Sequence, residues 1–367
     1  MEQCLLLRPG MRYFRSWALL LLVLFAAACS PAVGDPPTSS PEGTAATGDA
    51  DTVFGASELA GFKKVGGYAV SPVVRASGPA TRGGFLIDLW GDVGDVPVGA
   101  QVRGVRANGT YTNWFPAKIT WHEAPHLVSR ADLGESVGAT QFRIPVQQIR
   151  LIENVIYAGV TPAVHDAGDS HGSTSGIGST QQGLTSELIG LVQPRSAWGA
   201  RPAKCSSSDP DKSHMAIHHT FTPPSSSGGY ASRVRSIQSY HMDVRGWCDI
   251  GYHFLVTEDG RVWEGRPVDK LGAHVAHHNT GNIGVSWVGC FDKKACKGIS
   301  SSSEPSDAAL QAAGHVMHAL AQKFGITPSA DTIKGHRDHA GASTECPGDQ
   351  LEARIHDLRS MAGGQDP

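Results

Sequence analysis

Two low-complexity stretches divide this chain and thereby limit how it can fold. Residues 30–55 and 163–190 are rich in proline, glycine, serine and threonine and contain few large apolar side chains. Such segments bury too little apolar surface to offset the entropy lost on ordering the chain. We therefore expect two flexible linkers, one before a folded domain at residues 56–162 and one before a second domain at residues 191–367.

The first 29 residues have the features of an export signal. Three arginines precede a run of twelve apolar residues, which is too short to span a bilayer but suits a signal peptide. The run ends in AAA before Cys29, and this ending resembles the bacterial lipobox, in which the cysteine is acylated. It also fits an ordinary cleavage site, since Ala26 stands where the lipobox prefers Leu. We expect a protein exported to the cell envelope, lipid-anchored through Cys29 or else periplasmic or secreted.

The charge pattern argues against a nucleic-acid-binding protein. The formal net charge is -3, and no basic stripe runs through the sequence. A hydrophobic content of 40% with 18% charged residues is typical of a globular chain. After the leader, no stretch is long enough to cross a membrane, so we expect membrane attachment only through the lipid anchor. We also expect a monomer.

Residues 56–162 show the pattern of an all-β domain. Short strand-like runs are separated by turn residues, and QVRGVRA and TYTNWF flank Asn108-Gly109, a pair that favours a tight hairpin turn. No helical period of any length appears. The pattern predicts a β-sandwich of about seven to nine strands. The WHEAPH segment could be taken for a metal cluster, but its proline and the absence of a helix favour a solvated loop.

Residues 191–367 show strands that alternate with helices, which is typical of an α/β domain. The sequence predicts strands in HMAIHHTF and NIGVSWVGCF, a hairpin turning at Asp259-Gly260, and helices at 230–245, at 306–324 and in DQLEARIHDLRSM.

An odd number of cysteines follows the leader. Export implies an oxidising compartment, where cysteines pair. The five cysteines are Cys205, Cys248, Cys290, Cys296 and Cys346. One of them must therefore be free, bound to a metal or paired with another chain. Cys290 and Cys296 are close enough in sequence to bridge each other, and the sequence leaves the other three open.

Histidines concentrate in the second domain, where thirteen of the 17 follow residue 190. In the strand AIHHT, His219 shares its parity with bulky apolar residues, whereas His218 shares its parity with small and polar ones. His218 is thus the imidazole that faces a cleft. The segment GHRDHAGASTECPG adds His336 and Cys346. Two imidazoles and a thiolate suit a zinc site with an open fourth position, and zinc would account for the odd cysteine.

Two alternatives for Cys346 remain at this point. A structural zinc site would need a fourth protein ligand, for which His339 is the nearest candidate. A disulfide would pair Cys346 with Cys205, Cys248 or an unacylated Cys29.

The second domain resembles a known family over residues 193–361. The motifs RSAWGAR, IHHT, IQSYHMDVRGWCDIGYHFLVTEDGRVWEGR, GAH, NIGVSWVG, GHRD and TECPG occur in the order found in peptidoglycan recognition proteins and the related zinc-dependent N-acetylmuramoyl-L-alanine amidases. The resemblance implies a mixed β-sheet flanked by helices. It says nothing about residues 1–190.

The resemblance also implies roles for individual residues. His218, His336 and Cys346 would bind Zn²⁺, and Tyr252 and Thr344 would assist catalysis. Four further positions match or lie beside residues that line the family's peptidoglycan groove: His241, Trp247, His274 and Asn279.

The resemblance pairs the cysteines as well. Family members often link the positions of Cys205 and Cys248, which leaves Cys290 with Cys296 as a second bridge and Cys346 for the metal. One departure is that the spacing from His336 to Cys346 is two positions longer than the family usually has. A bulging loop at HAGA would absorb the two extra residues, although the position of Thr344 then becomes less certain.

The implied activity is hydrolysis of the amide between the lactyl group of N-acetylmuramic acid and L-alanine in peptidoglycan. No carboxylate base stands out, and Glu264 is only a weak candidate. Two alternatives remain: a non-catalytic peptidoglycan-binding protein of the same fold, and a wall-tethered surface protein whose main role lies in residues 56–162. Retention of the cysteine ligand argues against the first.

Overall fold

The computed structural model describes five stretches of the chain: residues 51–90, 99–161, 184–224, 229–296 and 304–363. The expected signal peptide, Cys29 and most of both expected linkers lie outside the described residues. The described residues all belong to one compact unit. None of the helices in the described stretches is long and apolar enough to cross a membrane.

The first part of the unit is a nine-stranded sheet in which every pair of strands is antiparallel. Its strands are β1 (Thr52–Gly55), β2 (Lys63–Val65), β3 (Tyr68–Val70), β4 (Val74–Leu89), β5 (Gln101–Val105), β6 (Phe115–Pro116), β7 (Lys118–Glu123), β8 (His126–Pro145) and β9 (Ile152–Val160). A short helix α1 (Ala56–Gly61) and a 3-10 turn η1 (Val146–Leu151) join them. The hairpin expected around Asn108-Gly109 is confirmed by the pairing of β5 with β6.

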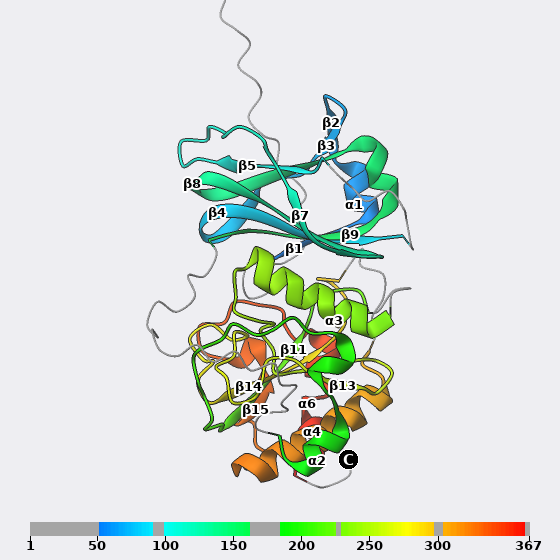
Figure 1. Cartoon of the computed structure of the whole chain (residues 1–367), viewed down its shortest axis with the longest axis vertical. Helices are drawn as coiled ribbons and strands as arrows, with labels where there is room; N and C mark the ends of the chain where they lie inside the picture. Colours follow the sequence, from blue (N-terminus) through cyan, green and yellow to red (C-terminus); the bar gives the residue numbers. More distant parts are fainter. Residues whose placement is uncertain (1–50, 91–98, 162–183, 225–228, 297–303, 364–367) are drawn as a thin grey trace, which may run out of the picture. The chain divides into compact units, whose positions relative to one another are not determined.

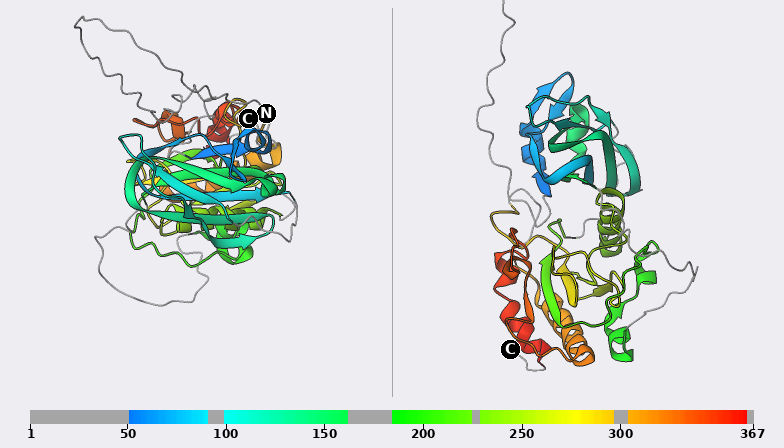
Figure 2. Two further views of the ribbon diagram at one scale, coloured as in Figure 1. Left: turned by 90° about the horizontal axis from the view of Figure 1, so that it is seen from above. Right: turned by 90° about the vertical axis from the view of Figure 1, so that its left-hand side faces the viewer.

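This sheet differs from the expected sandwich because its strands belong to one hydrogen-bonded sheet instead of two packed sheets. The reason lies in the long strands β4 and β8, of 16 and 20 residues, because β8 pairs with β3, β4, β5 and β7 and so keeps them in one sheet. Figure 2 shows this sheet from two further directions. Register shifts interrupt the pairing of β4 with β8, and such bulges let a long strand bend while it stays paired. One face covers a core of aromatic and aliphatic side chains that includes Phe85, Phe142 and Tyr157.

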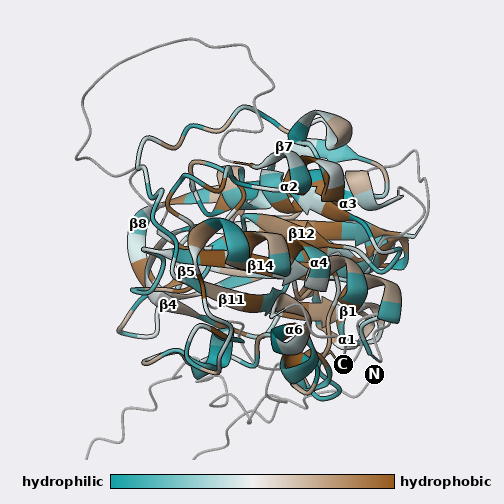
Figure 3. Cartoon of the chain, turned by 90° about the horizontal axis from the view of Figure 1, so that it is seen from below, coloured by the Kyte–Doolittle hydropathy of each residue, from teal (hydrophilic) through white to brown (hydrophobic). Residues whose placement is uncertain are grey.

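The second part contains a six-stranded mixed sheet with the order β10-β13-β12-β14-β11-β15. Its strands are β10 (Val192–Gln193), β11 (His214–His219), β12 (Phe254–Val256), β13 (Val262–Glu264), β14 (Asn282–Trp287) and β15 (Ile333–Gly335). Only β12 and β13 run antiparallel to each other, as expected for a hairpin. Every residue of β12, β13 and β14 is buried, as is typical of strands covered on both faces, and apolar residues give β12 its brown colour in Figure 3.

Helices cover both faces of the mixed sheet, as the resemblance implied. They are α2 (Ser186–Leu191), η2 (Arg195–Trp198), α3 (Gly229–Ser239), the π-helix η3 (Tyr240–Val244), α4 (Asp307–Phe324), η4 (His336–Asp338), α5 (Asp349–Glu352) and α6 (Ile355–Ala362). Side chains of α4 and α6 join one apolar cluster, and those of α3 join another on the opposite face (Figure 1).

Helix α4 shows how the sequence sets an element's ends. The Ser306 hydroxyl accepts a hydrogen bond from the backbone N–H of Ala309, and Gly325 takes the left-handed conformation that ends the helix. The expected helix at 306–324 is confirmed. The expected C-terminal helix is split into α5 and α6.

The nine-stranded sheet packs closely against α3 and η3. A Cβ at Gly84 on β4 would lie 2.1 Å from a methyl carbon of Val244, so only glycine fits there. Arg130 on β8 donates to the carbonyl oxygen of Asp243 at 2.6 Å, which satisfies a C-terminal carbonyl of η3. Asp88 and Arg233, both fully buried, form an ion pair at 2.8 Å. The two parts thus share an interior.

Candidate metal centre

Strand register brings two histidines together. Strands β11 and β15 are parallel neighbours in which Ile217 pairs with Gly335. The residues that follow in each chain segment are His218 and His336, so the two imidazoles meet at the same edge of the sheet. Their ring centroids lie 4.7 Å apart.

The loop after His336 returns Cys346 to the same place. The backbone N–H of Arg337 donates to the carbonyl oxygen of Cys346 at 2.9 Å, which closes the loop at its base. A turn from His339 to Ala342 holds the additional residues, as expected for a bulge at HAGA. The Cys346 sulfur lies 3.5 Å from Nδ1 of His218. The longer spacing therefore does not separate the two ends.

Among the described residues, one group of His, Cys, Asp or Glu side chains converges closely enough to hold a metal ion. It consists of His218, His336 and Cys346, whose ligand atoms lie within 4.8 Å of one another. His339 is not part of this group, so the four-ligand alternative finds no support. Cys346 forms no disulfide with a described cysteine, and this result removes the pairing with Cys205 or Cys248.

Burial sets the protonation of the three side chains. It lowers the pKa of His336 to about 4 and holds the pKa of His218 well below its ordinary value, with neighbouring histidines adding to both effects. Burial also raises the pKa of the Cys346 thiol to about 12, although the backbone N–H of His219 donates to the sulfur. Both imidazoles are thus neutral near pH 7, and the thiol ionises only when a cation stabilises the thiolate.

A relay of hydrogen bonds fixes the tautomer of His218. Nε2 of His274 lies 3.1 Å from the carbonyl oxygen of Asn282, which can only accept, so this nitrogen carries the proton. Nδ1 of His274 then accepts from Nε2 of His218 at 3.0 Å. The remaining nitrogen of His218, Nδ1, keeps its lone pair and faces Cys346. The relay therefore prepares His218 to bind a metal through Nδ1.

Strand β14 makes room for this relay at one glycine. A Cβ at Gly284 would lie 2.7 Å from the ring of His274, closer than real Cβ atoms approach. The sequence NIGV thus allows the imidazole to lie flat against the strand and reach His218.

The donor set fits zinc. Two neutral imidazoles and a thiolate are ligands that zinc prefers, and three protein ligands are typical of catalytic sites, where one position stays open. The buried, protonated thiol beside two unprotonated nitrogens is the arrangement that a divalent ion would convert to a bound thiolate.

Comparisons with known proteins identify the family of the second part. A family model described as N-acetylmuramoyl-L-alanine amidase matches residues 209–349. Peptidoglycan recognition protein 1 of Bos indicus is 33% identical over 179 residues, which are 48% of this chain and 85% of that protein. This chain belongs to the peptidoglycan recognition protein family.

Other members of the family match a smaller share of their own length. The N-acetylmuramoyl-L-alanine amidase of Sus scrofa is 36% identical over 166 residues, which are 44% of this chain and 26% of that protein. The chain thus spans about a quarter of the length of that relative. A solved structure of wild-type Drosophila PGRP-LB is 32% identical and covers 44% of this chain and 89% of its own, with a TM-score of 0.38.

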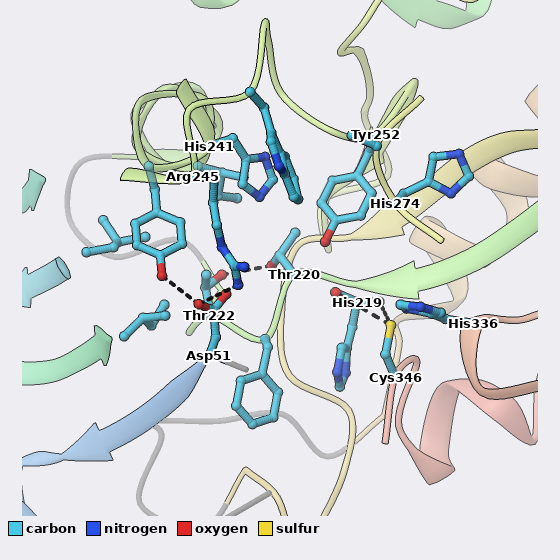
Figure 4. Close-up of a pocket in the computed structure, with 17 residues that line it drawn as sticks. Asp51, His219, Thr220, Thr222, His241, Arg245, Tyr252, His274, His336 and Cys346 are labelled. Atoms are coloured by element: carbon cyan, nitrogen blue, oxygen red, sulfur yellow. Dashed lines mark hydrogen bonds and ion pairs between the residues drawn. The ribbon is translucent and has the colours of Figure 1, made fainter. Parts of the chain in front are cut away.

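Tyr252, which the family resemblance singled out, lies beside the metal ligands. Its ring centroid is 5.3 Å from that of His218, and its hydroxyl points into the pocket that His336 and Cys346 also line (Figure 4). The ring of His241 meets that of Tyr252 edge-on with centroids 5.7 Å apart, and it is tilted against the ring of Trp247 with centroids 4.6 Å apart. The structure therefore brings Tyr252, His241 and Trp247 into the same pocket as His336 and Cys346.

Other residues expected at the site lie outside the pocket, and two of them accept hydrogen bonds from backbone N–H groups. The side chain of Asn279 accepts from the N–H groups of His274 and Val275 and holds their loop. The Thr344 hydroxyl accepts from the N–H of Cys346 at 3.1 Å. Neither Asn279 nor Thr344 is among the described residues that line the pocket, and Glu264 is also absent from it.

The expected disulfides are confirmed. Cys205 bonds to Cys248, and Cys290 bonds to Cys296. The first links the segment after η2 to the loop that carries Trp247.

Sequence reasoning missed several residues of this pocket. Asp51, Leu86 and Ile156 line it from the nine-stranded sheet, and Arg245 lines it from the end of η3. The family resemblance does not cover the first three, because it begins at residue 193. Arg245 had a signal, since it stands two residues before Trp247 in a matched motif.

Proposed function

We propose that this protein is a zinc-dependent N-acetylmuramoyl-L-alanine amidase. Its reaction would be hydrolysis of the amide that joins the lactyl group of N-acetylmuramic acid to L-alanine of the stem peptide. The observation that carries the proposal is the convergence of His218, His336 and Cys346, the last two of which line a pocket that also holds Tyr252.

His218, His336 and Cys346 would hold the zinc ion. Bound by these ligands, zinc supplies Lewis-acid chemistry, which activates a carbonyl group or a water molecule for hydrolysis. His274 contributes by keeping the proton of His218 on Nε2, so that Nδ1 stays available as a ligand.

Tyr252 would stabilise the developing negative charge on the scissile carbonyl oxygen. Its hydroxyl is a hydrogen-bond donor next to the ligand cluster, and such a donor is most effective where it is held in place before the reaction. The ring contacts of Tyr252 with His241, and of His241 with Trp247, would supply that support. Thr344 would assist from the loop that carries Cys346, provided that its hydroxyl turns from the backbone toward the substrate.

The pocket offers no free carboxylate base. Asp51 is the one carboxylate among the described residues that line it, and its side chain is engaged with Arg245. The proposed reaction therefore relies on the metal and on neutral donors.

Digestion of purified muropeptides with and without a chelator tests the proposal. Mass spectrometry should detect free muramyl glycan and intact stem peptide, and the chelator should abolish both products. Binding of muropeptides without cleavage, at full zinc occupancy, would instead identify a non-catalytic recognition protein. Export and lipid attachment at Cys29 remain part of the proposal, and labelling with a radioactive fatty acid in the host would test them.

A further inference from the structure

The pocket has a charged end opposite the metal ligands. There, Nη2 of Arg245 lies 2.7 Å from Oδ1 of Asp51. The hydroxyl of Tyr240 donates to the same oxygen at 2.6 Å. A guanidinium and a phenol hydroxyl together form a binding position for an anionic oxygen, and in this chain the carboxylate of Asp51 fills it (Figure 4).

Asp51 is held there by the nine-stranded sheet. The next residue, Thr52, begins β1 and pairs with Tyr157 on β9. Val53 then packs in one apolar cluster with Phe221 and Val244 from the second part of the chain. Pairing of Thr52 and packing of Val53 therefore hold Asp51 at the pocket, and the sheet supplies a wall of it.

A row of side chains connects this end to the metal end. The ring centroids of Tyr252 and His241 lie 5.7 Å apart, and those of His241 and Trp247 lie 4.6 Å apart. The guanidinium carbon of Arg245 lies 5.7 Å from the Trp247 ring. A substrate that extends from the metal ligands along this row would reach Arg245.

We propose that Asp51 is a specificity-determining residue that fills the anion-binding position of Arg245 and Tyr240, so that the pocket favours substrates with an uncharged group at this end. This inference rests on the proposed amidase function. Peptidoglycan stem peptides carry carboxyl groups that are either free or amidated. A free carboxylate would approach Asp51 with like charge in a half-buried pocket, whereas a carboxamide would not.

The test compares two synthetic muramyl tripeptides that differ only in the α-carboxyl group of D-glutamate, which is free in one and amidated in the other. For the wild-type zinc enzyme, kcat/KM should be higher for the amidated peptide. Asp51→Asn keeps an oxygen for Arg245 and Tyr240 but removes the charge. The ratio of kcat/KM for the free acid over the amide should rise by about tenfold or more in this variant.

Glu123→Gln is the matched control. Glu123 on β7 also pairs with an arginine of the second part, Arg235 on α3, but it does not line the pocket. The control should leave the ratio unchanged, and thermal melting should show both variants folded. Equilibrium binding of both peptides to the metal-free proteins should shift in the same direction, independently of turnover.

Three results would overturn the inference. If the enzyme hydrolyses both peptides and Asp51→Asn leaves their ratio as in the wild type, Asp51 does not set specificity, while the amidase function stands. If the wild-type protein, loaded with zinc, neither binds nor hydrolyses either peptide, the proposed function fails and the inference fails with it. A rise in the ratio that Glu123→Gln also produces would assign the effect to the contact between the two parts and not to Asp51.

Discussion

Nε2 of His218 donates a hydrogen bond to Nδ1 of His274 at 3.0 Å, and this contact determines which nitrogen of His218 can bind a metal. The ligand lies on β11 and its partner lies 56 residues later in the chain. His274 was expected in the substrate groove. Its ring lines the pocket, but the structure gives it a second contact, behind a metal ligand.

His274→Ala should weaken zinc binding. The variant leaves Nε2–H of His218 without its acceptor, so that the ring can adopt the other tautomer or rotate. Loss of such a partner typically lowers metal affinity by about 10- to 100-fold. Competition with a chromophoric chelator would measure it. His277→Asn is the control, because His277 is exposed in the same segment and Asn tolerates its positive φ. Unchanged affinity in His274→Ala would refute the role of the relay.

Cys346→Ser should abolish stoichiometric zinc binding. A serine hydroxyl does not ionise near neutral pH, so the site would keep two imidazoles and lose its anionic ligand. Elemental analysis after dialysis should find far less than one zinc per chain. Ser343→Ala, in the same loop and exposed, should bind zinc normally. A Cys346→Ser protein that retains one tightly bound zinc would show that the thiol is not a ligand.

Tyr252→Phe should retain zinc and slow turnover. The ring still packs on His241, but the hydroxyl that would stabilise charge on the carbonyl oxygen is gone. Removal of one such donor typically costs about 100- to 1,000-fold in kcat. Steady-state hydrolysis of a muropeptide measures the loss, with zinc content checked in parallel. Tyr230→Phe is the control, since Tyr230 packs against the same apolar cluster. Wild-type kcat in Tyr252→Phe would exclude the proposed role.

Local sequence patterns predicted the candidate metal ligands better than they predicted the residues around them. Strand alternation separated His218 from His219, and the odd cysteine count singled out Cys346 as exceptional. These are properties of neighbouring residues and of composition. The register of β11 against β15, which places His336 beside His218, depends on how distant strands pair, and no local pattern predicts that pairing.

The contacts missed from the sequence are those between distant segments. Asp51 meets Tyr240 across 189 positions, and Asp88 meets Arg233 across 145. The linker-like composition before residue 191 suggested two independent domains. Apolar periodicity shows which face of an element is buried, but it does not show what covers that face. The shared interior of the two parts therefore emerged only from the fold.

The metal-free protein should lose stability in mild acid. Burial lowers the pKa of His219 and of His274 to about 3, from an ordinary value of 6.5. The unfolded chain therefore binds more protons than the folded chain below pH 6.5, and the free energy of unfolding falls as the pH drops from there toward about 3. At pH 5, each such histidine should lower the free energy of unfolding by about 2 kcal/mol relative to neutral pH. Urea unfolding at several pH values would measure the fall.

A histidine variant separates this effect from general acid denaturation. In His219→Gln, the side-chain oxygen can still accept from the backbone N–H of Phe291, but the titratable group is gone. The free energy of unfolding should then decline less steeply between pH 6.5 and pH 5. A wild-type free energy that stays constant over this range would contradict the prediction.

The buried ion pair between Asp88 and Arg233 should affect the free energy of unfolding more than the partly exposed ion pair between the same two parts. Both side chains are fully buried, and His126 also contacts Asp88. Burial alone would raise the pKa of Asp88, but Arg233 and His126 lower it further than burial raises it. Asp88→Asn leaves a buried guanidinium without a countercharge, which typically costs about 3–5 kcal/mol.

The matched control for this pair is Glu123→Gln. It breaks a partly exposed pair with Arg235 between the same two parts, and such pairs contribute about 0–1 kcal/mol. The double variant Asp88→Leu with Arg233→Met removes both charges together and should recover most of the stability lost in Asp88→Asn. Chemical unfolding of the three variants tests this ranking. Equal losses in Asp88→Asn and Glu123→Gln would mean that burial of the first pair has no energetic consequence, and the two parts would then be held together by apolar contacts alone.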